Sequence, residues 1–152
     1  METNEKNAEV LNDLIEINND RIKGYEKAVA ETKTEDADLR DLFIEVATVS
    51  RDCLDQLKKF VFRNGEAPAE GTTQRGKIYR VWMDVKAVIT GHNRKAILAS
   101  CEFGEDAAQR AYQSALDTDG ISEDVRAVIT EQKAKLRKSH DRIKMMRDTQ
   151  SA

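Results

Sequence analysis

The sequence predicts an all-α domain built as a four-helix bundle, and three observations support this prediction. Charged residues make up 35% of the chain and hydrophobic residues 39%, while proline occurs once and glycine seven times. This composition suits long helices with one solvated face and is poor in turn formers. Apolar residues also recur every three or four positions, which is the period of one helix face. A length of 152 residues matches one ordinary domain, so we expect a single domain over residues 1–152.

The first two predicted helices cover residues 9–31 and 37–63. The apolar stripe of the first helix is interrupted by one polar residue, Asn18. Acidic residues open the second helix favourably for its dipole, and an Asn-Gly pair followed by a proline ends it. Because the connection between the two helices is short, we expect them to be antiparallel neighbours.

In the second half of the chain, the sequence predicts another helical hairpin, which follows a long connection. Loop-forming residues are followed by a short amphipathic helix over residues 77–90. Two longer helices then cover residues 94–117 and 122–148, with Ser122 as the natural N-cap of the last one. Two hairpins joined by a long crossover are the connectivity of ferritin-like four-helix bundles. The sequence therefore predicts that fold, with one short extra helix in the crossover.

A resemblance to a known family rests on three segments: LNDLIEINNDRIKGYEKA, GKIYRVWMDVKAVITG and RKAILASCEFGEDAAQRAY. These segments resemble parts of a bacterial family of ferritin-like four-helix-bundle proteins. The likeness spans Glu9 to Arg147. It implies the fold, a bacterial source and a domain of unknown function, and it brings no substrate with it.

The positions at which such a bundle binds metal have mostly lost their ligands. Di-iron carboxylate members place one Glu on each of two helices and a Glu-x-x-His motif on each of the other two. The six corresponding positions here are Asn18, Thr48, Arg51, Glu105, Arg137 and His140. Of the expected ligands only Glu105 and His140 remain, with Glu102, Glu16 and Glu45 as displaced substitutes on the helix flanks. We therefore expect no cofactor and no di-iron centre. A weak site for iron or another divalent metal at Glu105, His140 and Glu102 is the alternative.

The inward polar residues instead favour a hydrogen-bonded core. The predicted cluster consists of Asn18, Ser50, Arg51, Glu105, Gln132 and Ser139. A guanidinium group stays protonated and repels metal ions, so we expect Arg51 to neutralise Glu105, or Glu105 to accept a hydrogen bond from Asn18 or Gln132. Both cysteines fall on apolar stripes, which predicts buried thiols.

The charge and hydropathy of the chain limit the classes of partner that it is expected to bind. The formal charge of −3 gives no reason to expect nucleic-acid binding. The last helix is rich in Lys and Arg, but no aromatic residues lie between them to stack on bases, so binding to an anionic surface is only a third hypothesis. The polar N-terminus predicts a cytoplasmic protein without a membrane span.

The short helix in the crossover predicts self-association. Val81, Trp82 and Val85 give it an apolar face, and such faces often form interfaces, so we expect a homo-oligomer, most simply a dimer. The sequence contains no phosphate loop, nucleophile elbow or paired-acid motif, so we predict no catalytic residue. The leading hypothesis is a non-enzymatic bundle that acts through an unknown protein partner and is stress-related. A metal-binding protein or oxidase with a degenerate site is the alternative.

Overall fold

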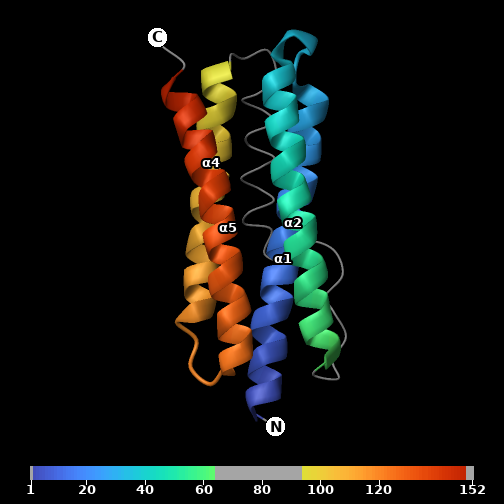
Figure 1. Ribbon diagram of the computed structural model, residues 1–152, viewed down its shortest axis with the longest axis vertical. Coiled ribbons are helices and arrows are strands. Elements are labelled where there is room, and N and C mark those ends of the chain that lie inside the picture. Colours follow the sequence, from blue (N-terminus) through green and yellow to red (C-terminus); the bar gives the residue numbers. More distant parts are fainter. Residues whose placement is uncertain (1, 64–93, 150–152) are drawn as a thin grey trace.

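The computed structural model describes residues 2–63 and 94–149, which form four long helices (Figure 1). These helices are α1 (Glu2–Glu31), α2 (Ala37–Arg63), α4 (Arg94–Leu116) and α5 (Glu123–Asp148), and a short 3-10 helix at Thr34–Asp36 precedes α2. No strand occurs in these two ranges. The prediction of an all-α structure with four main helices is confirmed. The predicted helix over residues 77–90, with Val81, Trp82 and Val85, lies outside the described residues.

The helices form two antiparallel pairs, α1 with α2 and α4 with α5 (Figure 1). α1 also contacts α4, and α2 also contacts α5, so each helix has a neighbour in the other pair. α2 and α4 run in the same direction along the bundle, so the end of α2 and the start of α4 lie at opposite ends of it (Figure 1).

Polar contacts join the ends of the two pairs. Arg94 at the start of α4 lies 2.9 Å from an Asp36 oxygen and 2.6 Å from an Asp38 oxygen, beside the start of α2. At the opposite end, Asn7 of α1 donates to the Ser122 hydroxyl at 3.0 Å and accepts from the Ser122 backbone N–H at 3.0 Å. These contacts set the register between the pairs, because each joins a helix of one pair to a helix of the other.

α1 begins earlier than the sequence predicts. The predicted start is residue 9, whereas the helix begins at Glu2. Its first turns contain no apolar stripe, but Asn7 and Ala8 are only 3% and 7% exposed, since α1 packs beside the start of α5 there. The additional turns are stabilised by tertiary contacts rather than by the local apolar pattern.

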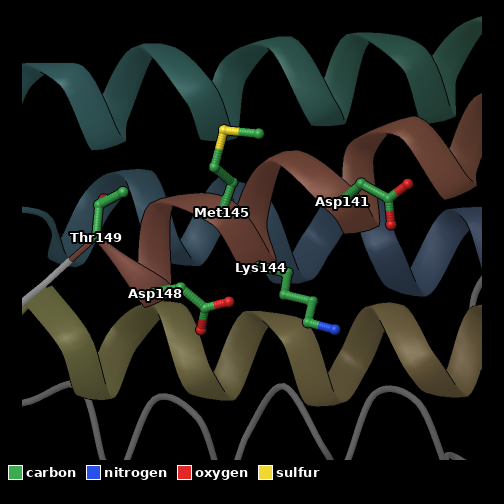
Figure 2. A pocket seen from close by; sticks show the side chains of 5 residues that line it. All are labelled: Asp141, Lys144, Met145, Asp148 and Thr149. Atoms are coloured by element: carbon green, nitrogen blue, oxygen red, sulfur yellow. The ribbon is translucent and has the colours of Figure 1, made fainter.

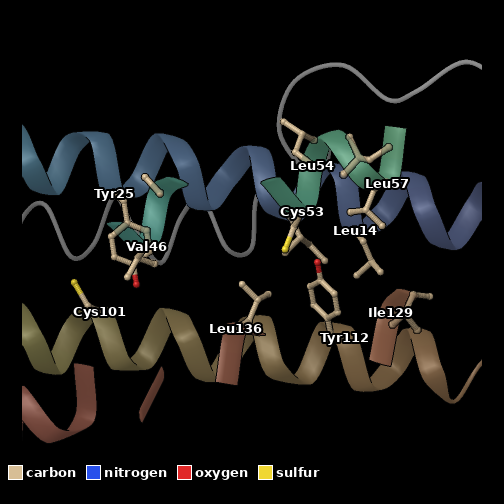
Figure 3. Packing of buried hydrophobic residues seen from close by; sticks show 14 of the residues in the cluster. Leu14, Tyr25, Val46, Cys53, Leu54, Leu57, Cys101, Tyr112, Ile129 and Leu136 are labelled. Atoms are coloured by element: carbon tan, nitrogen blue, oxygen red, sulfur yellow. The ribbon is translucent and has the colours of Figure 1, made fainter. Parts of the chain in front are cut away.

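The core lies along the bundle axis, between the two helix pairs. Aliphatic side chains such as Leu14 and Leu136 fill it, and buried aromatic and sulfur-containing side chains lie among them (Figure 3). Cys53 and Cys101 are free and 2% and 0% exposed, as predicted from their apolar stripes. Figure 3 shows Cys101 and Tyr25 pointing toward one another from opposite sides of this core.

Candidate functional site

A buried ion pair between Arg21 of α1 and Glu105 of α4 occupies the bundle interior. Both side chains are 0% exposed. Arg21 Nη2 donates to Glu105 Oε1 at 3.1 Å, and Arg21 Nη1 contacts the other carboxylate oxygen, so the pair is bidentate. Two neighbours complete it: Arg21 Nε donates to the Ser50 hydroxyl at 3.0 Å, and the Tyr25 hydroxyl donates to Glu105 Oε1 at 3.0 Å. The pair therefore links three helices and leaves no open side for a further ligand on Glu105 Oε1.

The electrostatics of this pair keep a permanent positive charge in the core. Burial alone lowers the pKa of Arg21, but the charge and hydrogen bond of Glu105 outweigh burial, and the net direction is upward. Burial, followed by the Glu105 charge, raises the pKa of Tyr25 well above its ordinary value, so its hydroxyl keeps its proton and acts as a donor. The guanidinium ion is thus neutralised by a carboxylate and not by proton loss.

A second polar layer connects all four helices. Asn18 of α1 donates to the Tyr112 hydroxyl of α4 at 2.9 Å, and this hydroxyl donates to Gln132 Oε1 of α5 at 2.8 Å. Gln132 Nε2 in turn donates to the Cys53 carbonyl at 3.1 Å and to Gln56 Oε1 at 2.9 Å, both on α2. Because these groups are buried and directional, the layer favours one relative placement of the helices.

A third polar group lies on the flank between α4 and α5. His140 Nε2 is 2.5 Å from Asp106 Oδ1, and His140 Nδ1 is 3.1 Å from Asp141 Oδ1. One turn before Asp106 on α4, Glu102 forms an ion pair with Arg147 of α5. Ligand atoms of Glu102, Asp106 and His140 all lie within 4.8 Å of one another. This set is called the flank cluster below.

Comparison with known proteins places the chain in a family. Residues 6–118 match the family described as Domain of unknown function (DUF2383). The chain belongs to the DUF2383 family. The matched range includes α1, α2 and α4 and stops before α5, so it contains the ion pair but not His140. No curated protein matches this DUF2383 chain.

The structure of the DUF2383 chain corrects one member of the predicted polar core. Asn18, Ser50, Glu105, Gln132 and Ser139 are all buried. Arg51 does not lie with them: its side chain is 46% exposed and pairs with Glu26 at 2.9 Å. The reason is helix geometry, since Arg51 follows the inward Ser50 by one residue and is therefore turned about 100° away from it.

Arg21 neutralises Glu105, which is the role that was predicted for Arg51. Arg21 was not identified from the sequence. Ile22, the apolar residue next to Arg21, is only partly buried. A signal was present, because Asn18, Arg21 and Tyr25 follow the three-and-four spacing of one helix face. The apolar Ile22 beside Arg21 hides this signal, because an apolar residue is the more usual occupant of an inward position.

Two of the three predicted metal ligands, His140 and Glu102, lie together, but Glu105 does not join them. Glu105 lies with Arg21, whereas His140 lies with Asp106 and Glu102. The other positions of the di-iron pattern do not fit either, since Thr48 is exposed and Arg137 is 60% exposed and pairs with Asp141. A di-iron centre therefore does not fit this interior, where the carboxylate of Glu105 is already neutralised by Arg21.

A surface hollow near the end of α5 has no convergent chemistry. It is lined by Asp141, Lys144, Met145, Asp148 and Thr149. Figure 2 shows that these side chains come from one segment and diverge, with Met145 pointing toward α2. Separately, no helix of the described residues is long and apolar enough to cross a membrane.

Proposed function

We propose that this chain is a non-enzymatic ferritin-like bundle from a bacterium, which acts through contacts with other proteins. The observation that supports this most is the buried pair of Arg21 and Glu105. A di-iron centre brings four positive charges into a dry interior, which is tolerable only when several carboxylates surround it. A permanent guanidinium ion in this interior adds a further positive charge and uses up the carboxylate of Glu105.

The ferritin-like part of the proposal is supported by the direction of the helices. Two antiparallel pairs, with α2 and α4 running the same way, need a long crossover between them (Figure 1). Such a crossover is typical of ferritin-like bundles. The resemblance of three sequence segments to a bacterial ferritin-like family points to the same fold.

Metal analysis tests the non-enzymatic part. Protein purified without chelator is analysed for iron, then supplied with Fe²⁺ without oxygen and exposed to air while oxygen uptake is recorded. We expect less than one tightly bound iron per chain and no ferroxidase activity. Two tightly bound metal ions per chain that are both lost in Glu105→Gln would overturn the proposal.

Self-association is part of the same proposal. Its support is the apolar pattern of Val81, Trp82 and Val85 in the sequence, and the proposed assembly is a dimer. Light scattering of the wild type and of Trp82→Ala over a range of concentrations tests it. If the wild type is a monomer at high concentration, the proposed dimer is wrong, and the other parts of the proposal are unaffected.

A stress-related role and a cytoplasmic location complete the proposal. The location is supported by two free cysteines.

Binding to an anionic surface through α5 has weaker support. Several of its cations lie near carboxylates: Lys135 near Glu131, Arg137 near Asp141, Arg142 near Glu45 and Arg147 near Glu102 and Asp148. These pairs partly neutralise the basic face, and a surface binder needs cations that are available to the partner.

A further inference from the structure

We propose that Glu102, Asp106 and His140 bind one divalent transition-metal ion on the flank between α4 and α5. This site is separate from the buried pair, because Glu105 faces Arg21 and contributes nothing to it. It also goes beyond the proposed function, which concerns the core and protein contacts. Zn²⁺ is the natural probe, since one imidazole and two carboxylates are among its usual ligands and a water molecule can complete a tetrahedral shell.

Helix geometry assembles the three ligands. Glu102 and Asp106 are four residues apart on α4, so their side chains lie one above the other on the same face. α5 runs antiparallel to α4 and places His140 opposite Asp106. Their ligand atoms lie within 4.8 Å of one another, which is close enough for one ion to contact all three after small side-chain rotations.

His140 is held in an orientation that suits metal binding. Its side chain is only 6% exposed, and Asp141 Oδ1 lies 3.1 Å from Nδ1. A carboxylate at one imidazole nitrogen is the usual outer contact of a metal-binding histidine, because it leaves the other nitrogen to bind the ion. That other nitrogen, Nε2, faces the Asp106 carboxylate. The buried imidazole and its outer carboxylate make the cluster a constructed site rather than a chance group of acids.

Asp106 has to move away from His140 when the ion binds, and its exposure allows this movement. His140 Nε2 and Asp106 Oδ1 are 2.5 Å apart, whereas two tetrahedral ligands at Zn²⁺ bond lengths are about 3.3 Å apart. The Asp106 side chain is 47% exposed, so it can rotate outward without disturbing the core. His140 stays in place.

Arg147 opposes metal binding at the flank cluster, so its removal tests the proposal. It pairs with Glu102, so the ion has to displace a guanidinium group or share the carboxylate with it. Removal of this cation should therefore tighten metal binding. A purely structural cluster, in which His140 only links two carboxylates by hydrogen bonds, predicts no such gain.

The experiment is a Zn²⁺ titration by calorimetry of the full chain after chelator treatment. We expect one ion per chain, an affinity about 10 to 100 times weaker in Asp106→Asn and in Asp141→Asn, and no measurable binding in His140→Gln. Arg147→Gln should bind more tightly than wild type. Two matched controls should bind like wild type: His92→Gln, which changes the other histidine, and Glu45→Gln, which removes a carboxylate paired with Arg142 instead of Arg147.

Two outcomes would overturn this proposal without touching the proposed function. One is no Zn²⁺ binding by the wild type. The other is binding that survives in both His140→Gln and Asp106→Asn, each shown to be folded by circular dichroism. If His140→Gln does not fold, Asp106→Asn decides, because Asp106 is half-exposed. Conversely, two tightly bound metal ions per chain that depend on Glu105 would overturn the proposed function, whatever the result at the flank cluster.

Discussion

Glu105→Gln should destabilise the bundle by about 3 to 5 kcal/mol, because it removes one partner of a buried ion pair. Both side chains of the pair are 0% exposed, so water cannot replace the lost carboxylate. Glutamine keeps the volume of the side chain and an oxygen for the Tyr25 hydroxyl, and the change therefore isolates the charge. Since domains are stable by only about 5 to 15 kcal/mol, the loss should be large and easy to measure.

Arg21→Met should behave differently as the pH changes. A carboxyl group left alone in the core can become neutral by taking up a proton, whereas the guanidinium group left by Glu105→Gln cannot lose one. At pH 7, protonating a glutamate whose ordinary pKa is about 4.3 costs about 4 kcal/mol, and this cost falls toward zero near pH 4. The folded variant then binds a proton that the unfolded chain releases, so its stability should rise as the pH falls. The loss in Glu105→Gln should stay nearly constant between pH 5 and pH 8.

Urea unfolding followed by circular dichroism at pH 5 and pH 7 measures these losses. The matched control is the exposed pair of Arg51 and Glu26, where Glu26→Gln should cost at most about 1 kcal/mol. Replacing both core partners, as Arg21→Met with Glu105→Leu, should cost less than Glu105→Gln alone. A loss below about 1 kcal/mol in Glu105→Gln, or an equal pH response in the two single variants, would refute the reasoning.

Three further predictions concern other groups. Tyr112→Phe removes a hydroxyl that joins two buried amides and should cost about 1 to 3 kcal/mol in urea unfolding, with an unchanged helical spectrum. Burial raises the pKa of Cys53 to about 11, so its reaction with a disulfide reagent at pH 8 should be about 100 times slower in the folded protein than in urea. Asp38→Asn should cost less than about 1 kcal/mol. The Arg94 hydrogen bond holds the pKa of Asp38 below its ordinary 3.8, so this small loss should be present at neutral pH and vanish as the pH falls through that range.

Helix positions were predictable because they depend on local patterns. The predicted range 37–63 equals α2, and the predicted ranges for α4 and α5 differ from the structure by one residue at one end. Ser122 also stands at the predicted N-cap position, although its hydroxyl contacts the side chains of Asn7 and Asp124 rather than a backbone N–H of the first turn of α5. The early start of α1 was not predictable, because the contact that stabilises it joins residues 115 positions apart.

The core was predictable as a polar cluster but not in its pairing. Periodicity identifies inward positions on each helix, and Asn18, Glu105 and Gln132 are buried as that reasoning expects. Pairing depends on how far each helix is rotated and shifted against the others, which single-helix patterns do not contain. A rotation of about 100° separates Arg51 from its inward neighbour, and the same step separates Ile22 from Arg21. For the same reason, His140 was predicted to lie with Glu105, whereas it lies with Asp106.

The ion pair of Arg21 and Glu105 does in this bundle what carboxylates and metal ions do in a di-iron bundle: it joins helices of the two pairs through charge. Apolar side chains alone allow many relative positions of two amphipathic hairpins, whereas buried charges and hydrogen bonds are satisfied in few of them. Arg21, Ser50 and Glu105 connect α1, α2 and α4, and the layer around Tyr112 connects all four helices. A closed ion pair offers no open coordination position, in contrast to a catalytic metal centre. Among the described residues, we therefore expect metal binding at the flank cluster around His140 rather than at Glu105.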